Sequence, residues 1–215
     1  MSKHLLIGIT GGSGSGKTYL LEQIKKAFSE DEICIISQDN YYKPIDQQVS
    51  DSNGIENFDL PGSIDNESFA SDIARLKSGK SIERKEYSFN NSASAPRMLK
   101  ILPAPIIIAE GIFVFHDQSI LRSLDFKVFV DSDLQKMLKR RIQRDAIERG
   151  YDINDVRYRY QHHVLPAYKQ YILPYKKEAD FTVQNDNNNI FLQHLNLLIE
   201  KIKALHASKK KVNTR

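Results

Sequence analysis

The sequence has no tryptophan and a single cysteine, Cys34, so no disulfide can form within the chain. Cys34 lies in the apolar run 33–36, where a buried and unreactive thiol is expected. The longest apolar runs are far too short to span a bilayer, and no signal-peptide pattern opens the chain. We therefore expect a soluble cytoplasmic protein that does not bind a membrane.

Excess charge is also small. The 215 residues carry a net charge of +4, and 40% of them are hydrophobic, which is an ordinary globular composition. Much of the excess lies at the end of the chain, in Lys209, Lys210, Lys211 and Arg215. We expect one domain over residues 1–207 and a mobile basic tail over 208–215. A nucleic-acid partner would rest on this tail alone, and none is expected.

Short apolar runs alternate with helical patterns along the chain. Continuous apolar strands of this kind are typical of a parallel sheet that is covered on both faces, in an α/β fold. The expected strands are Leu5–Ile9, Ile33–Ser37, Ile106–Ala109, Phe126–Val130 and, more weakly, Phe181–Val183. The pattern also predicts a polar loop over 185–189 and a last helix over Ile190–Leu205.

The stretch 40–104 is too long for a plain connection between two neighbouring strands. It contains a predicted helix over Asn66–Leu76 and a predicted hairpin of 82–89 with 98–102, around a polar tip at 90–96. An insertion of this size, at the end of the sheet that carries the glycine-rich loop, predicts a substrate lobe.

The glycine-rich loop follows the first predicted strand and precedes a predicted helix. Its sequence fits the pattern G-x-x-x-x-G-K-[ST], a phosphate-binding P-loop. Glycines allow backbone N–H groups to surround phosphate oxygens, and the following helix directs its positive end at the same anion. The lysine reaches the β- and γ-phosphates, and the hydroxyl binds Mg²⁺. The loop consists of Gly11, Gly12, Ser13, Gly14, Ser15, Gly16, Lys17 and Thr18.

Two acidic residues follow predicted strands near this loop. Glu110 ends the run 106–109, where a carboxylate can hold a metal ion or its water shell. Asp39 follows the run 33–37 and could accept a proton from an attacking hydroxyl. Each also has a plainer interpretation, Glu110 as a surface acid and Asp39 as a turn residue.

A basic helix is predicted over Asp133–Arg149, with Leu134, Leu138 and Ile142 on one apolar stripe and Gly150 as its stop. Arg140, Arg141 and Arg144 fall within an arc of roughly 100° on this helix. Such a cluster could stabilise a transferring phosphoryl group. The alternative is a solvated face whose arginines pair with Asp145 and Glu148.

These segments, taken together, resemble the uridine–cytidine kinase family, within the group that contains phosphoribulokinase and pantothenate kinase. The resemblance covers about residues 4–200, in the family's order, through GGSGSGKT, SQDNYYK, NFDLPGSID, EYSF, IIIAEGI, FVD and RRIQRDAIERG. It implies a P-loop nucleoside-triphosphate hydrolase-like three-layer fold. The parallel sheet has five strands, with an inserted substrate lobe and an arginine-rich lid over 133–175. It also implies transfer of the ATP γ-phosphate to a ribose 5′-hydroxyl, and a homo-oligomer, often a tetramer.

The resemblance also implies roles for individual residues. Asp39 matches the catalytic base, assisted by Lys17 and Arg144, while Thr18, Glu110 and Asp39 match metal positions. Arg149 and Asn188 fall where the family binds ATP, with Asn188 near adenine. The acceptor would contact Asp59, Tyr42, Tyr87, Phe89 and Arg141. The positions that depart from the family are Ser92 in place of His, Tyr151 in place of Arg, and Arg159 in place of Gln.

Because those three positions help to bind the nucleoside in the family, the acceptor stays open. Uridine or cytidine is the leading expectation, as in pyrimidine salvage. Another ribose-containing compound or small alcohol is the second, and a GTPase switch or a non-catalytic nucleotide-binding regulator is a remote third. The sequence has no N-K-x-D guanine motif, and it retains Asp39, which a regulator would not need. Preference between ATP and GTP as the donor is not determined by these residues.

Overall fold

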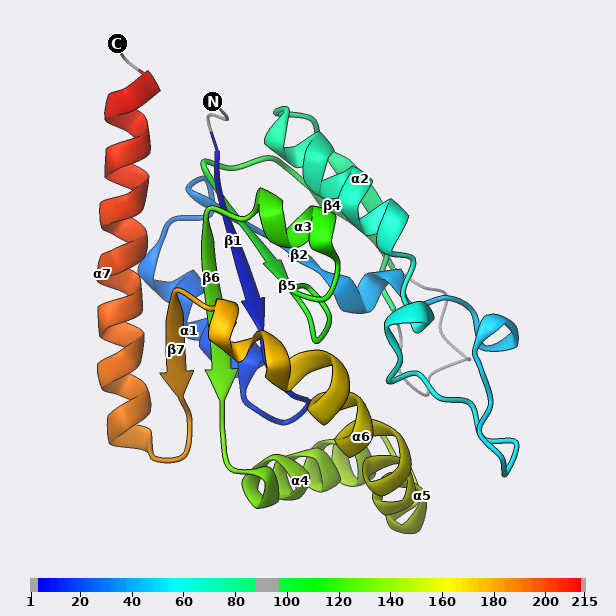
Figure 1. Ribbon diagram of the computed structural model, residues 1–215. Coiled ribbons are helices and arrows are strands. Elements are labelled where there is room, and N and C mark those ends of the chain that lie inside the picture. Colours follow the sequence, from blue (N-terminus) through cyan, green and yellow to red (C-terminus); the bar gives the residue numbers. More distant parts are fainter. Residues whose placement is uncertain (1–3, 88–96, 214–215) are drawn as a thin grey trace.

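The centre of the protein is a five-stranded sheet, seen in a computed structural model that describes residues 4–87 and 97–213 (Figure 1). All pairings between neighbouring strands are parallel, and the strand order is β2-β5-β1-β6-β7. The strands are β1 (Leu5–Thr10), β2 (Ile33–Ser37), β5 (Ile106–Glu110), β6 (Phe126–Asp131) and β7 (Phe181–Gln184). The predicted strands and the parallel sheet are confirmed, with boundaries that differ by at most one residue.

Helices cover both faces of this sheet. One face packs against α1 (Lys17–Ala27) and α7 (Asn188–Asn213), the other against α2 (Asn66–Lys77) and α3 (Gln118–Ser123). Successive residues of β1 divide between the two cores, because side chains alternate along a strand. Leu6 packs on the α2 side and Ile7 on the α1 side, and both are fully buried. Burial on two faces explains why the strands read as continuous apolar runs.

The insertion after β2 divides into two parts. Its helix α2 begins at the Asp65 cap, which accepts a hydrogen bond from the Ser68 backbone N–H, and it buries Phe69 and Leu76 against the sheet. β3 (Ile82–Lys85) and β4 (Met98–Ile101) form the predicted antiparallel hairpin, whose tip lies outside the described residues. The segment before α2 projects at the right of Figure 1 and contains only short 3₁₀ turns, at Gln38–Tyr41, Ile45–Gln47 and Pro61–Ser63. Part of the insertion thus completes the core rather than forming a separate lobe.

The basic helix is α4 (Leu134–Ile142), continued by a widened π-helical turn over Gln143–Glu148. Gly150 follows with a φ of 70°, as its predicted role as a stop requires. The predicted apolar stripe is wrong in detail, because Leu134 is 37% exposed and Met137 provides the buried contact. Met137 rather than Leu134 faces inward because α4 packs against Gly12 and Gly14 of the P-loop.

A chain of short helical segments follows α4 and returns to the sheet. It consists of α5 (Ile153–Arg159), a π-helical turn Tyr160–Val164, α6 (Leu165–Ala167), a second π-helical turn Tyr168–Ile172 and a 3₁₀ segment Leu173–Glu178. Figure 1 shows α4, α5 and α6 together at the lower end of the sheet. Asp152 caps α5 by accepting hydrogen bonds from the N–H groups of Asn154 and Asp155.

The last helix is longer than predicted at both ends. α7 runs from Asn188 to Asn213, so the polar loop shrinks to 185–187 and the expected tail is helical as far as Asn213. The helix begins early because the Asn187 side chain accepts a hydrogen bond from the Asn189 N–H. Lys209 donates to the carbonyl of His4 at 2.8 Å, which anchors the far end. Within the residues described, no helix combines the length and apolarity that crossing a bilayer requires.

Candidate active site

The P-loop joins the end of β1 to the start of α1 and has the predicted conformation. Gly14 and Gly16 have φ values of 81° and 100°, in the left-handed region that favours glycine. A Cβ atom at Gly14 would lie 2.3 Å from the Met137 carbonyl oxygen, so a side chain there is excluded. Lys17 donates from Nζ to the Gly11 carbonyl at 2.8 Å and to that of Gly12 at 3.2 Å. The ammonium group therefore lies inside the loop, where a phosphate group would bind.

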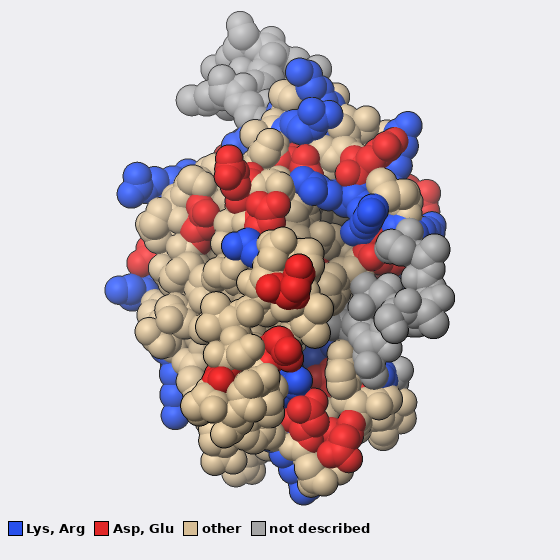
Figure 2. Space-filling model, turned by 90° about the vertical axis from the view of Figure 1, so that its right-hand side faces the viewer, with Lys and Arg blue, Asp and Glu red and all other residues tan. Residues whose placement is uncertain are grey.

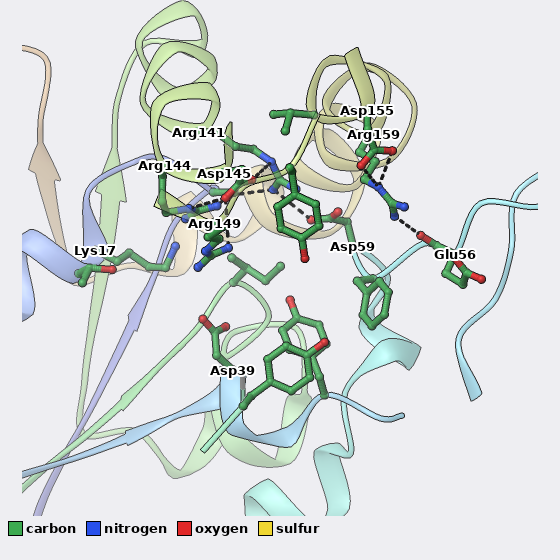
Figure 3. A pocket seen from close by; sticks show the side chains of 18 of the residues that line it. Lys17, Asp39, Glu56, Asp59, Arg141, Arg144, Asp145, Arg149, Asp155 and Arg159 are labelled. Carbon is green, nitrogen blue, oxygen red and sulfur yellow. Dashed lines mark hydrogen bonds and ion pairs between the residues drawn. The ribbon is translucent and has the colours of Figure 1, made fainter. Parts of the chain in front are cut away.

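A cavity of about 380 Å³ opens beside this loop (Figure 3). It lies at the carboxyl ends of β1, β2 and β5, where open parallel sheets commonly bind ligands. The lid helices form its opposite wall. Residues from all of these elements line it: Ser13, Lys17, Thr18, Asp39, Tyr42, Ile45, Glu56, Phe58, Asp59, Tyr87, Glu110, Ile112, Arg141, Arg144, Asp145, Arg149, Tyr151, Asp155, Val156 and Arg159.

Two carboxylates approach Lys17 from neighbouring strands. Glu110 is the last residue of β5, and its register partner on β2 is Ser37, two residues before Asp39. Burial raises the pKa of Asp39, against the opposing effect of Lys17 and the lid arginines. Burial, and then the charge of Asp39, raises the pKa of Glu110 to about 7. Burial also lowers the pKa of Lys17, although both carboxylates oppose this shift.

These carboxylates suit a divalent cation whose other ligands come from elsewhere. Burial removes water from both carboxylates, and the nearby cations only partly offset this cost. Among the residues described, no three His, Cys, Asp or Glu side chains gather into a metal-binding group. Mg²⁺ commonly takes one or two protein carboxylates together with waters and substrate phosphates. Thr18, Glu110 and Asp39 fit that pattern of partial coordination.

The lid contributes Arg141, Arg144 and Arg149 to the cavity, and all three contact Asp145. The alternative interpretation correctly paired Arg141 and Arg144 with Asp145, but the face is not solvated, because Asp145 is only 4% exposed. The grouping of Arg140 with Arg141 and Arg144 is also wrong. Arg140 points behind the P-loop, where its guanidinium donates to the carbonyl of Asn185 at 2.7 Å and to the hydroxyl of Ser132 at 3.1 Å.

The middle of the cavity has a carboxylate beside aromatic rings. Asp59 is 9% exposed, and its Oδ1 lies 3.8 Å from Arg141 Nη1. The ring of Tyr42 packs against Phe58 and Tyr87, with centroid distances of 5.9 and 5.2 Å. The backbone N–H of Tyr87 donates to the Asn40 side chain at 3.0 Å, which fixes the hairpin beside Asp39.

The far end of the cavity holds Arg159, a predicted site residue, and Asp155, which the sequence patterns did not predict. Arg159 Nε donates to Asp155 Oδ2 at 2.9 Å, and Arg159 Nη1 donates to the Glu56 carbonyl at 2.8 Å. Tyr151 lies nearby, and burial raises the pKa of its hydroxyl. The departures at Tyr151 and Arg159 thus face the cavity, as Figure 3 shows for Arg159.

The same wall of the lid is attached to the projecting segment before α2. Asp51 Oδ2 lies 2.7 Å from His163 Nε2 and accepts a hydrogen bond from the Tyr158 hydroxyl at 2.8 Å. Asn53 donates to the Tyr158 hydroxyl at 2.6 Å. Together with the bond from Arg159 to Glu56, these contacts join segment 51–56 to α5 and the turn that follows it.

Of the predicted P-loop residues, Ser13, Lys17 and Thr18 line the cavity. Outside the P-loop, three predicted site residues are not brought to it by the described structure. Asn188 is exposed at the first turn of α7 and does not line the cavity, while Phe89 and Ser92 lie outside the described residues. Sequence reasoning also missed Glu56, Phe58 and Asp155 as cavity residues. A signal existed for two of them, since Phe58 adjoins Asp59 and Asp155 precedes Arg159 by one helical turn.

The surface around the site carries both signs of charge. On the face shown in Figure 2, acidic and basic side chains lie next to one another. The lid arginines and Lys17, by contrast, are gathered along the phosphate end of the cavity (Figure 3). Positive charge is therefore concentrated where an anionic group can be enclosed.

Comparison with known proteins places the chain in one family. Residues 6–191 match the phosphoribulokinase/uridine kinase family, and the chain belongs to it. It is 34% identical to uridine-cytidine kinase B of Dictyostelium discoideum over 99% of this chain and 90% of that protein. It is 34% identical to the uridine kinase of Brevibacillus brevis over 94% and 97% of the two chains. The structure of phosphoribulokinase from Rhodobacter spheroides shares the fold, with a TM-score of 0.60 and 19% identity over 88% of this chain and 74% of that one.

Proposed function

We propose that the protein is an ATP-dependent kinase that transfers the γ-phosphate to the 5′-hydroxyl of a nucleoside, with uridine or cytidine as the principal acceptor. One observation carries the proposal. A single cavity joins Lys17 and the lid arginines at one end to Asp59 and the aromatic rings further along, and Asp39 lies between them (Figure 3). The match to uridine kinases spans nearly the whole length of both chains and supports the acceptor class.

The phosphate end binds the donor in this proposal. Backbone N–H groups over Gly11–Thr18 surround the phosphates, and Lys17 leaves its carbonyl partners to contact the β/γ oxygens. Arg144 and Arg149 stabilise charge on the transferring group, and Asn188 is assigned to the adenine side by resemblance. Thr18, Glu110 and Asp39 would hold Mg²⁺, which supplies positive charge that neutralises the phosphate oxygens when it is bound.

The acceptor lies between Asp39 and the aromatic rings. Asp39 accepts the proton of the attacking hydroxyl, and its raised pKa brings it closer to the operating pH, as a general base requires. Asp59 accepts hydrogen bonds from ribose hydroxyls, with Arg141 close enough to assist. Tyr42, Tyr87 and Phe58 enclose the sugar and base. Phe89 and Ser92 are assigned here by resemblance.

A second acceptor class is favoured by one observation, the replaced residues at the far end. Tyr151 and Arg159 differ from the family pattern and face the cavity, and Arg159 is held by Asp155 and Glu56. The same chemistry on another ribose-containing compound or a small alcohol would fit this end. A regulator without activity is disfavoured, because Asp39 lies in the cavity beside Lys17.

A panel of acceptors tests the proposal. Uridine, cytidine, a purine nucleoside, ribose and small alcohols are incubated with Mg²⁺ and either ATP or GTP, and product is measured. A 2′-deoxy acceptor should lose about tenfold or more in kcat/KM, because it leaves an oxygen of Asp59 unpaired. Activity on alcohols but on no nucleoside would select the second class, and no phosphoryl transfer at all would refute the proposal.

The assembly and setting of the protein belong to the same proposal. By resemblance we propose a homo-oligomer, with a tetramer as the expected form, working in the cytoplasm in pyrimidine salvage. Light scattering at several protein concentrations measures the mass directly. A monomer at all concentrations would remove the oligomer from the proposal and leave the cavity chemistry unaffected.

A further inference from the structure

Asp145 occupies an unusual position among the lid arginines. It lies in the widened turn 143–148 and is 4% exposed, yet it directly contacts three positively charged side chains. Its Oδ1 accepts hydrogen bonds from Arg144 Nε at 2.8 Å and from Arg149 Nη1 at 3.1 Å. Its Oδ2 lies 3.1 Å from Arg141 Nε. One buried carboxylate is thus shared by three guanidinium groups.

The part of each guanidinium that Asp145 contacts determines where the rest of it points. Asp145 binds Arg141 and Arg144 from the Nε side, which leaves their terminal nitrogens directed away from it. Those terminal nitrogens meet at the P-loop, where Arg141 Nη1 and Arg144 Nη2 donate to the Ser13 hydroxyl at 3.0 and 3.4 Å. The donors therefore already point at the loop that surrounds phosphate before any ligand is present.

Electrostatics explains why a carboxylate is needed at this place. Three guanidinium groups in a half-buried cluster repel one another, and the repulsion would favour conformations in which they separate. Burial and the nearby charge of Arg144 lower the pKa of Arg149, which reports the same crowding of positive charge. A single negative charge at the centre offsets this repulsion and leaves the cluster net positive toward an anion.

We propose that Asp145 is a positioning residue for phosphoryl transfer: it gathers the lid arginines and directs their terminal donors at the P-loop before the donor nucleotide binds. In this role the carboxylate acts through the arginines that it contacts rather than on a reactant. It acts through Arg144 above all, because that residue has the shortest bond to Asp145 and also reaches Ser13. The proposal deepens the proposed kinase function and rests on it only for the turnover measurements.

The test is a double-mutant cycle between Asp145 and Arg144. Asp145→Asn should lower kcat by about 100-fold, the size expected when preorganised charge stabilisation is lost. Asp145→Glu keeps the charge and should recover at least about tenfold of that loss. In an Arg144→Ala background, Asp145→Asn should cost less than about threefold more, because the residue through which it acts is gone. If the fold-losses in kcat of the two single variants multiply in the double variant, the proposal is overturned, because a purely structural role of Asp145 gives that result.

Two further measurements keep the result clear. Asp180→Asn is the control, because Asp180 is likewise an aspartate paired with a basic side chain, that of Lys127, but it lies just before β7, at the opposite end of the strands. It should leave kcat within about twofold of wild type. If Asp145→Asn does not fold, Asp145→Glu is taken through the same cycle, and independence from Arg144 again overturns the proposal.

A binding measurement separates this proposal from the proposed function. The cycle is repeated by calorimetry with a non-hydrolysable ATP analogue and Mg²⁺, which needs no acceptor. If wild type phosphorylates no acceptor but the cycle on analogue affinity shows coupling between Asp145 and Arg144, the kinase assignment fails and the positioning role stands. If wild type is an active kinase and neither cycle shows coupling, the positioning role fails and the kinase assignment stands.

Discussion

The two ends of the cavity are built in different ways. At the phosphate end, Lys17 and the lid arginines contact backbone carbonyls and the buried Asp145, so the cationic groups are fixed around one place. At the far end, Arg159 is held by Asp155 and by the Glu56 carbonyl of the projecting segment. If the proposed function holds, we expect substitutions at the phosphate end to change phosphoryl transfer and substitutions at the far end to change only the choice of acceptor.

The largest effect is expected at the phosphate end. Lys17→Ala and Thr18→Ala should each lower turnover by about 1000-fold, since each removes a group that acts on the charge of the transferring phosphoryl. Steady-state kinetics with saturating acceptor measures this. Retention of more than about a tenth of the wild-type rate by either variant would exclude its assigned role.

Asp39 lies between the two ends and should separate binding from chemistry. Asp39→Asn keeps the shape of the side chain but cannot accept a proton, so kcat should fall by about 100-fold or more. Affinity for ATP, measured by calorimetry, should change by less than about threefold. Equal losses in rate and affinity would instead make Asp39 a ligand of the nucleotide or of its metal.

Substitutions at the far end of the cavity should change the kinetics with the acceptor and leave those with ATP unchanged. Ser92→His with Tyr151→Arg restores the family residues, and we expect kcat/KM for uridine to rise about three- to tenfold, because a charged fork replaces one neutral hydroxyl. Arg159→Gln, made separately, tests the third departure. KM for ATP should stay constant in all of them. A wild type that already prefers uridine over a purine nucleoside by about a hundredfold would contradict relaxed base recognition.

The smallest effect concerns the stability of the ligand-free protein. The pKa of Glu110 is raised to about 7, so between its ordinary value near 4.5 and 7 the folded protein binds more protons than the unfolded chain. The contribution of Glu110 to the free energy of unfolding therefore falls as pH rises through that window. Glu110→Gln should raise the free energy of unfolding by about 1 kcal/mol at pH 8 and by less at pH 5.5. Denaturant titrations of both proteins, without Mg²⁺ or nucleotide, measure the difference, and an equal effect at both pH values would show that Glu110 does not titrate there.

Local patterns predicted the elements well because each strand and helix has its own signal. The run Ile106–Ala109 is apolar throughout because both its faces are covered. The P-loop motif by itself predicted the conformation of the loop. The predicted boundaries of α7 were wrong because its early start depends on a hydrogen bond to the Asn187 side chain. Its late end depends on the hydrogen bond from Lys209 to the His4 carbonyl. Neither contact leaves a periodic pattern.

The site was predictable where one short motif carries it. Lys17 and Thr18 begin the helix after the P-loop and Glu110 ends β5, so their places could be inferred. Arg140 was misplaced because helical spacing fixes an angle around the axis but not the direction of a long side chain, and Asn185 and Ser132 draw it behind the loop. Glu56 was missed because its contact with Arg159 crosses about a hundred residues of chain, and no local pattern reports such a contact.

The contacts of Asp51 have a consequence for motion. His163 and Tyr158 belong to the returning helices, whereas Asp51 and Asn53 belong to the segment before α2, yet hydrogen bonds join them. A swing of α5 away from the sheet must therefore either break these bonds or carry segment 51–56 with it. In the second case segment 51–56 and α5 move together as one rigid unit.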